Sequence, residues 1–141
     1  MTLQVSYIDG GCCNNEGRQT HIKGCEVPWI YHGVKPEERK LGQKFLVDVD
    51  AWLDLQPAGE SDCLSDTVSY TDIYRIVKEV VEGPAHNLLE SVAQLVASTT
   101  LTKHPQISAV RVKVGKPHVA VPGSVDYLGV EILRYRRPEL P

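Results

Sequence analysis

The sequence lacks the features that define several large classes of protein. No apolar run approaches the roughly 20 residues that a membrane-spanning helix needs. The N-terminus shows neither the apolar core of a secretory signal nor the Arg-rich pattern of a transit peptide. The net charge is −3, so there is no excess of basic residues that would indicate binding to nucleic acid or to an anionic membrane. We therefore expect a cytosolic protein with neither a nucleic-acid nor a membrane partner.

Recognisable metal motifs are also missing. The four cysteines form no C-x-x-C pair, and the five histidines form no H-x-H or H-E-x-x-H pattern. We expect free thiols in a reducing compartment, no metal and no cofactor, with scattered metal ligands as the open alternative. The cysteines are Cys12, Cys13, Cys25 and Cys63.

What the chain does contain is enough for one globular domain. It has 141 residues, 42% of them hydrophobic, and no internal repeat. The segment Asp9–Gly17 is rich in turn-forming residues, which predicts a poorly ordered N-terminal arm over residues 1–20. The folded domain is expected over residues 21–135, and a short tail over 136–141.

Apolar residues alternate with polar ones in several stretches, which is typical of half-buried strands. The predicted strands are His21–Tyr31, Lys44–Leu55, a segment from about Val110 to Lys116, and Val125–Arg134. Pro28 interrupts the first strand and favours a bulge or an edge position. In the second strand, one face carries Phe45, Val47, Val49, Ala51, Leu53 and Leu55, and the other carries Lys44, Asp48, Asp50 and Asp54.

Two helices are predicted between the second and third strands, after a polar loop over Pro57–Val68. Ser69 is the expected N-cap of the first helix, which Gly83-Pro84 ends. Asn87 is the expected N-cap of the second, which ends near His104-Pro105. The apolar stripes are Ile73, Ile76, Val77, Val80 and Val81, and then Leu88, Leu89, Val92, Leu95 and Val96.

The resulting order is strand, strand, helix, helix, strand, strand. It predicts an α+β domain with a four-stranded antiparallel sheet and both helices on one face. The other face stays uncovered and the edge strands need pairing or protection, so association through the sheet is expected.

Lys116 breaks the pattern of its strand. It falls in phase with Val110, Val112 and Val114, so its ammonium is aimed at the buried face, while Gly115 allows close approach and Pro117 ends the ladder. A lysine in that position needs a partner. The alternative is a side chain that reaches out to water at the sheet edge.

Glu90 follows Asn87 by three residues, which is also a capping-box variant. A carboxylate at a helix N-terminus is stabilised in its charged form and can accept two parallel hydrogen bonds. Pterins and guanines present a matching edge with their ring amide and exocyclic amine. Both the structural and the binding role stay open for Glu90.

Tyr70 and Glu38 are further candidates. Tyr70 begins a helix, where most tyrosines only pack, although a phenol near a lysine can transfer protons. Glu38 lies in the charged loop Gly33–Gly42, where most side chains are simply solvated.

Seven motifs occur together and in order. They are Tyr31-His32-Gly33-Val34-x-Pro36-Glu37-Glu38, Leu41-Gly42-Gln43-Lys44-Phe45, Ala58-Gly59-Glu60-Ser61-Asp62, Asp66-Thr67-Val68-Ser69-Tyr70, Asn87-Leu88-Leu89-Glu90, Lys116-Pro117 and Asp126-Tyr127-Leu128-Gly129-Val130-Glu131-Ile132. In this order they resemble the dihydroneopterin aldolases of folate biosynthesis, and the plant members in particular. The similarity covers residues 21 to 135.

The resemblance implies a role for each candidate. Lys116 would be the catalytic lysine, Tyr70 its phenol partner and Glu38 an acid beside the hydroxylated side chain of the substrate. Glu90 would bind the pterin amide and amine, with backbone groups around Val68 and Leu89 completing the slot. Dihydroneopterin would be cleaved to 6-hydroxymethyl-7,8-dihydropterin and glycolaldehyde without metal or Schiff base, with epimerisation as a side activity.

The resemblance also implies the tunnelling fold, in which subunit sheets join into a barrel and two tetrameric rings stack as an octamer. The sites would then lie between subunits, with Tyr70 from the neighbour of the chain that supplies Lys116. Two features depart from the family pattern. The stretch Gly24–Tyr31, with Pro28, is one residue longer, and the arm before His21 has no counterpart.

Two other functions stay open beside the aldolase. A dihydroneopterin triphosphate epimerase would need cations for three phosphates, and only Lys35, Arg39 and Lys40 form an obvious group. A catalytically silent pterin or purine binder would use Glu90 but would not need Lys116 and Tyr70. A zinc-dependent pterin synthase is disfavoured by the histidine spacing.

Overall fold

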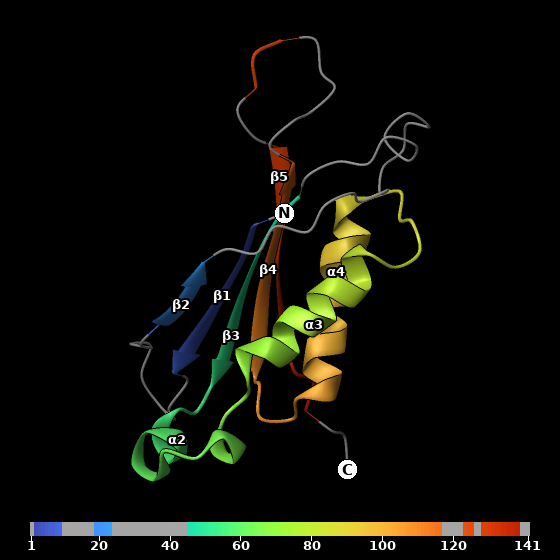
Figure 1. Ribbon diagram of the computed structural model, residues 1–141. Helices are drawn as coiled ribbons and strands as arrows, with labels where there is room; N and C mark the ends of the chain where they lie inside the picture. Colours follow the sequence, from blue (N-terminus) through green and yellow to red (C-terminus); the bar gives the residue numbers. More distant parts are fainter. Residues whose placement is uncertain (1, 10–18, 24–44, 117–122, 126–127, 139–141) are drawn as a thin grey trace.

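The computed structural model describes residues 2–9, 19–23, 45–116, 123–125 and 128–138, shown in colour in Figure 1. An α+β fold is observed, as predicted, with the sheet on one side and the helices on the other. The elements are β1 (Thr2–Asp9), β2 (Gln19–Lys23), β3 (Leu46–Leu53), α2 (Gln56–Ser61), the 3-10 helix η1 (Leu64–Asp66), α3 (Tyr70–Val81), α4 (Leu89–Lys103), β4 (Ala109–Lys116) and β5 (Leu128–Tyr135).

The sheet has five strands in the order β2-β1-β3-β4-β5, not the predicted four. The pairs β3–β4 and β4–β5 are antiparallel, as predicted, and the additional strand β1 pairs antiparallel with β2 but parallel with β3. The register aligns Val49 with Val112, and Val112 with Ile132. The central strands therefore bring their apolar residues to one face, because side chains in paired strands at the same register point the same way.

The strand β1 lies in the segment over which a poorly ordered arm is predicted, and Thr2–Asp9 pair there with β2 and β3. Leu3, Val5 and Tyr7 alternate with polar residues, which is a strand pattern that the turn-forming residues just after it obscure. The predicted strand His21–Tyr31 coincides with the observed β2 only over residues 21–23. Its remainder, including Pro28, lies outside the described residues.

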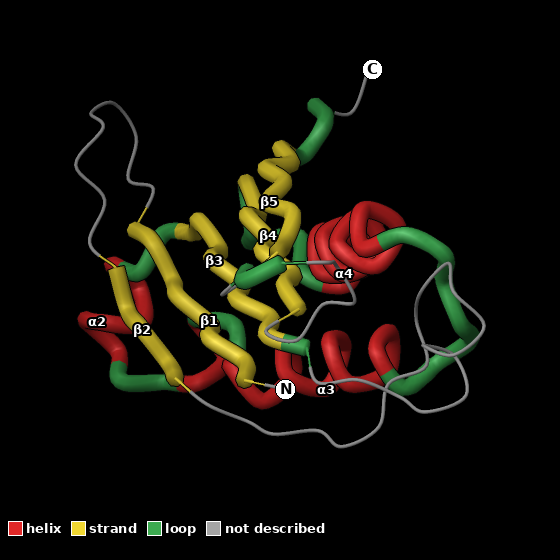
Figure 2. The backbone as a smooth tube through the Cα atoms, turned by 90° about the horizontal axis from the view of Figure 1, so that it is seen from above, coloured by secondary structure: helices red, strands yellow, loops and turns green. Residues whose placement is uncertain are grey.

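The hydrophobic core fills the space between the sheet and the two long helices. Figure 2 shows α3 and α4 lying along the same face of the sheet. All five residues of the predicted stripe on α3 are buried. On α4, Val92 and Val96 of the predicted stripe are buried, together with Ala93, Ala97 and Thr100, whereas Leu88 and Leu95 are exposed. Small alanines on this face allow the helix to pack closely on β4 and β5.

The start of α3 confirms the predicted cap. Ser69 is the N-cap, and its hydroxyl accepts a hydrogen bond from the Thr71 backbone N–H at 3.3 Å. The helix ends at Val81, just before Gly83. A Cβ at Gly83 would lie 2.7 Å from the Glu79 carbonyl oxygen, so no larger side chain fits there without a shift of the backbone.

Two predictions about the helices are wrong. The polar loop predicted over Pro57–Val68 contains α2 and η1. Asn87 is not the N-cap of α4, because the backbone of Leu88 is still extended (φ −120°, ψ 142°) and helical geometry begins only at Leu89. Leu88 therefore occupies the N-cap position, and it supplies no side-chain hydrogen bond.

The sheet face away from the helices carries a charged pair. Asp50 is only 8% exposed, and its Oδ2 accepts a hydrogen bond from Arg111 Nε at 2.6 Å. The Arg111 guanidinium also lies over the Trp52 ring, 5.6 Å from its centroid. The sheet face that was expected to stay uncovered is therefore shielded from water at Asp50, because Arg111 pairs with its carboxylate.

Candidate functional site

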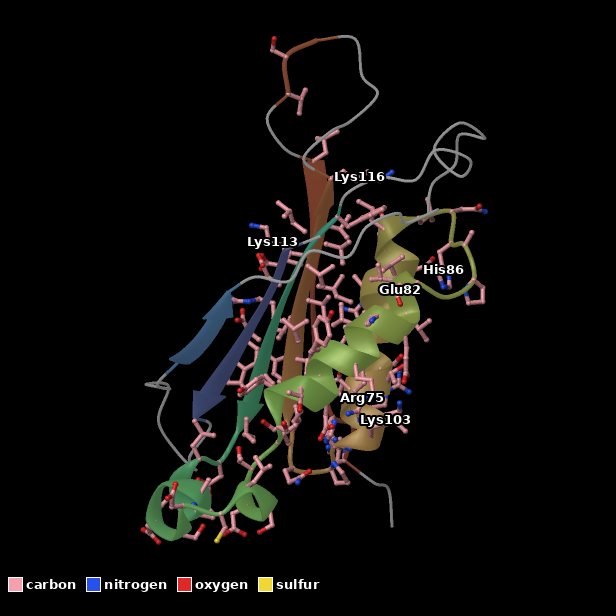
Figure 3. All side chains as sticks on the ribbon, viewed as in Figure 1. Arg75, Glu82, His86, Lys103, Lys113 and Lys116 are labelled. Atoms are coloured by element: carbon pink, nitrogen blue, oxygen red, sulfur yellow. The ribbon has the colours of Figure 1, made fainter. Side chains whose placement is uncertain are left out.

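Lys116 is the last residue of β4, at the upper end of the sheet in Figure 3. Lys116 is half-buried and follows the buried Gly115. The ammonium Nζ lies 5.6 Å from the centroid of the Phe45 ring, and Phe45 is 1% exposed and belongs to the core. Lys116 is thus aimed at the helix side of the sheet, as the alternation predicts, and the aromatic face stabilises its positive charge.

Glu90 and Leu89 lie at the same end of the molecule as Lys116. The C-terminus of α4 meets the start of β4, where the Ile107 N–H donates to the His104 carbonyl at 3.1 Å. The helix and the strand therefore run in opposite directions, and the start of α4 lies beside the end of β4 (Figure 1). Glu90 is exposed and Leu89 is half-buried against the core.

Glu90 occupies the second position of α4, one residue earlier than a capping box requires. The structural explanation for Glu90 is thereby weakened, since its carboxylate has no cap partner at the N-cap position. No ion pair within the described ranges includes it. A carboxylate in the first turn still benefits from the helix dipole, and Glu90 is exposed to solvent.

Tyr70 and Val68 lie at the other end of the sheet. Tyr70 is the first residue of α3 and is 55% exposed, whereas Val68 is 4% exposed and packs in the core. Figure 1 shows α3 starting next to α2 at the lower end and running toward the loop that precedes α4. The structure therefore brings Glu90, Leu89 and Lys116 to one end of the sheet, and Tyr70 and Val68 to the opposite end of the same sheet. Glu38 lies outside the described residues.

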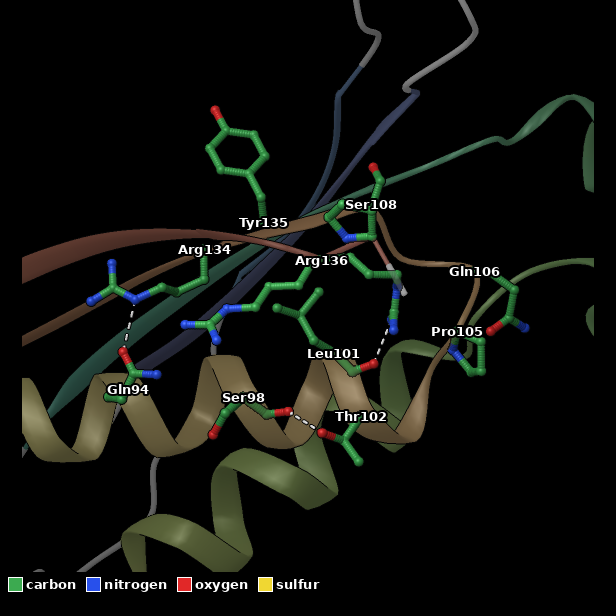
Figure 4. Close-up of a pocket in the computed structure, with 12 residues that line it drawn as sticks. Gln94, Ser98, Leu101, Thr102, Pro105, Gln106, Ser108, Arg134, Tyr135 and Arg136 are labelled. Carbon is green, nitrogen blue, oxygen red and sulfur yellow. Dashed lines mark hydrogen bonds between the residues drawn. The ribbon is translucent and has the colours of Figure 1, made fainter. Parts of the chain in front are cut away.

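A cleft that sequence reasoning missed lies between the outer side of α4 and the end of β5 (Figure 4). Its volume is about 1080 Å³. Three arginines among four consecutive residues were the signal in the sequence. The lining residues are Gln94, Ser98, Leu101, Thr102, Pro105, Gln106, Ser108, Arg134, Tyr135, Arg136, Arg137 and Pro138.

The arginines of the cleft differ in their partners. Arg136 closes the C-terminus of α4 by donating hydrogen bonds to the carbonyl oxygens of Leu101, His104 and Ile107. Arg134 donates through Nε to Gln94 Oε1 at 2.8 Å. Arg137 is exposed. Because a helix C-terminus carries partial negative charge, Arg136 is largely compensated, and Arg134 and Arg137 supply the positive potential of the cleft.

His104 is a titratable group outside the candidate site, at the C-cap of α4. Burial lowers its pKa below the ordinary value, and Lys103 adds to this effect, whereas Asp72 opposes it. Its Nε2 atom is buried without a hydrogen-bond partner. His104 is therefore a neutral, packed histidine at neutral pH.

None of the described helices is long and apolar enough to span a membrane. Among these same residues, no group of three or more His, Cys, Asp or Glu side chains is arranged to hold a metal ion.

Comparison with known proteins places this geometry in context. The sequence profile of the FolB dihydroneopterin aldolase family matches residues 20–133. Dihydroneopterin aldolase 1 of Arabidopsis thaliana is 55% identical over 124 residues, which cover 87% of this chain and 84% of that protein.

Two solved structures are similar to the fold. Escherichia coli dihydroneopterin aldolase in complex with neopterin has a TM-score of 0.68 at 31% identity, covering 78% of this chain and 96% of that one. The Burkholderia dihydroneopterin aldolase bound to guanine has a TM-score of 0.62 at 29% identity, covering 80% of this chain and 86% of that one. The similarity therefore extends over most of this chain and over most of each of the two solved chains.

Proposed function

Since the chain belongs to the dihydroneopterin aldolase family, we propose that its two separated groups of residues form one site between neighbouring copies, where 7,8-dihydroneopterin is cleaved. The enzyme is a dihydroneopterin aldolase of folate biosynthesis that releases glycolaldehyde and 6-hydroxymethyl-7,8-dihydropterin. The catalytic domain spans residues 21–135. One observation supports the shared site. Lys116 and Glu90 lie at one end of the sheet, and Tyr70 lies at the opposite end.

Glu90 binds the substrate by its pterin edge. Its exposed carboxylate at the start of α4 can accept hydrogen bonds from both the ring amide N–H and the exocyclic amine. The related structures with neopterin and with guanine support this assignment, because these two ligands share that donor edge. Backbone groups at Leu89, and at Val68 of the adjacent copy, complete the slot for the ring.

Lys116 is the general acid and base of the reaction. The ring C=N of dihydroneopterin is conjugated to its side chain, so it can accept the electrons released when the first and second side-chain carbons separate. The lysine therefore need not form a Schiff base. Its ammonium at the end of β4 transfers protons between the ring nitrogen and the side-chain hydroxyl, directly or through a water.

Tyr70 and Glu38 act on the side chain of the substrate. The phenol of Tyr70 is half-exposed, so it can enter a neighbour's site and return a proton to the carbon that the cleavage leaves behind. Glu38 is proposed to hold the hydroxylated end of the substrate. Epimerisation is an expected side activity, since it only requires the aldehyde to rebind in the flipped orientation.

The assembly that follows is a ring of copies joined edge to edge through their sheets. Heterologous contacts of this kind close into rings when the rotation between copies allows. We propose four copies to a barrel and two stacked rings. Cys63 is a free, exposed thiol, which supports the proposed reducing environment of the cytosol.

One assay tests the activity. Purified protein in EDTA is incubated with dihydroneopterin, and glycolaldehyde is measured against a no-enzyme control. Dihydroneopterin triphosphate is assayed in parallel. Glycolaldehyde release at substrate concentrations in the micromolar range supports the aldolase, whereas conversion of the triphosphate alone would overturn it in favour of the epimerase.

A further inference from the structure

The chain has a single phenylalanine, Phe45, and its ring lies next to the ammonium of Lys116. Phe45 stands directly before β3, which begins at Leu46. Its side chain is among the largest that are fully buried, and it belongs to the hydrophobic core. A role in the core explains the burial of this ring, but it does not explain why a charged side chain lies over it.

The register of the sheet places Phe45 opposite Lys116. Leu46 pairs with Gly115 in the ladder between β3 and β4, and these two strands are antiparallel. One step further along the ladder, Phe45 therefore faces Lys116. Directly opposed residues of antiparallel strands project to the same face with their Cβ atoms about 4.5–5.5 Å apart, so the meeting of these two side chains follows from the strand pairing.

The contact joins a rigid partner to a flexible one. Lys116 Nζ lies 5.6 Å from the centroid of the Phe45 ring, within the range of about 6 Å over which the negative face of an aromatic ring attracts an ammonium. A fully buried ring is held in one orientation by its close-packed neighbours. Lysine, in contrast, carries its charge on a flexible four-carbon chain. The ring therefore determines where the lysine holds its ammonium.

From this geometry we infer that Phe45 is a positioning residue for the reaction. Its ring holds the Lys116 ammonium on the helix side of the sheet, at the end where α4 begins with Leu89 and Glu90. Phe45 acts through the lysine and not on the substrate. The inference rests on the proposed role of Lys116 as general acid and base, and it adds the reason why the ammonium is in place before substrate binds. Such preorganisation lowers the barrier of a proton transfer.

Fluorination of the ring separates its charge distribution from its size. Fluorine withdraws electron density from the ring face and weakens the attraction for a cation, yet it is only slightly larger than hydrogen. Because Phe45 is the only phenylalanine, 4-fluorophenylalanine supplied in place of phenylalanine labels the full chain at this position alone. Incorporation of 3,4,5-trifluorophenylalanine at codon 45 completes the series.

The kcat of dihydroneopterin cleavage is expected to fall stepwise along this series, by about three- to tenfold in total, because a cation–ring contact contributes a factor of this size. The KM should stay within about twofold, since the pterin edge is bound by Glu90 and not by the lysine. A residue that only packs in the core would give a kcat that does not depend on the number of fluorine atoms, and its effect would be confined to the Tm.

Trp52 offers a matched control, because it forms the same kind of contact away from the candidate site. The Arg111 guanidinium carbon lies 5.6 Å from the centroid of the Trp52 ring. Removal of that contact in Trp52→Leu is expected to leave kcat unchanged. Thermal melts of all variants show that each is folded.

The fluorine at position 45 also reports on the contact without any turnover. Its NMR resonance in the 4-fluorophenylalanine protein is expected to move when Lys116→Met is introduced, and to stay in place in Trp52→Leu. A resonance that ignores Lys116→Met, a kcat that is independent of fluorination, or an equal loss of kcat in Trp52→Leu would each overturn the inference. Absence of glycolaldehyde release from the unmodified protein would instead overturn the proposed function, and the positioning role with it.

Discussion

The two ends of this molecule differ in what they contribute to the candidate site. At the upper end, β4 stops at Lys116 and α4 starts at Leu89, so one chain brings a cation and a carboxylate to the same edge of the core. At the lower end, α3 starts at Tyr70, which is 55% exposed and lies at the opposite end of the sheet from that carboxylate. Each end of one chain therefore carries only some of the candidate residues.

The difference follows from how the elements are connected. The strand β4 runs antiparallel to α4 and returns the chain to the end where α4 starts, so Leu89 and Lys116 lie at the same end of the sheet. The helix α3 begins at the opposite end of the sheet from these two points, because it follows β3 and the short helices α2 and η1. Within one chain, Tyr70 and Lys116 therefore lie at opposite ends of the sheet.

The largest effect is expected from Lys116→Met, which breaks the upper half of the site. Loss of the general acid and base should lower kcat by about 10²–10⁴-fold, while the sheet stays folded around Val110, Val112 and Val114. Steady-state cleavage of dihydroneopterin and a thermal melt check the two parts. Turnover close to that of the unmodified enzyme would remove Lys116 from the mechanism.

Glu90→Gln should separate binding from chemistry at the same end. The neutral amide cannot accept both pterin hydrogen bonds, so pterin affinity should fall by about 2–5 kcal/mol. Loss of a carboxylate from the first turn of α4 should cost about 0.3–1 kcal/mol of stability as well. Calorimetric titration with neopterin measures the affinity. A lower Tm with unchanged affinity would assign Glu90 a purely structural role.

Mixed assemblies join the upper end of one chain to the lower end of another. Lys116→Met and Tyr70→Phe proteins should each be poorly active, but denaturing and refolding them together should restore activity. In a ring of heterologous contacts with random mixing, about a quarter of the sites combine an intact Lys116 with an intact Tyr70. Activity no higher than that of the separate variants would place both residues in one chain's site.

The smallest effect is expected at His104, which lies at the C-cap of α4, at the lower end of the molecule. It concerns the dependence of the Tm on pH. Because burial lowers its folded-state pKa, the unfolded chain binds more protons below about pH 6.5. Its contribution to stability is therefore complete above that pH and is lost as the pH falls through it. The decrease in Tm from pH 7.5 to 5.5 should be smaller in His104→Asn. If the Tm of His104→Asn falls by as much as that of the unmodified protein, the pH dependence arises from other histidines.

The sequence by itself determined the elements whose residues repeat with a clear period. The alternation around Val112 predicted β4 and the inward direction of Lys116, and the stripe from Ile73 to Val81 predicted α3 with its Ser69 cap. The family and its chemistry also came from the sequence, because seven short motifs keep their order and spacing. Local period and local capping are properties that neighbouring residues decide among themselves.

Only the tertiary structure decided the elements that depend on distant partners. Pairing with β3 makes Thr2–Asp9 a strand, even though turn-forming residues follow it at once. Asp50 is buried because Arg111 reaches it from the adjacent strand, and the arginine cleft exists because β5 ends against the outer side of α4. The separation of Tyr70 from Lys116 was decided in the same way, since the distance between two residues depends on where the chain turns and what it packs against, which no local pattern records.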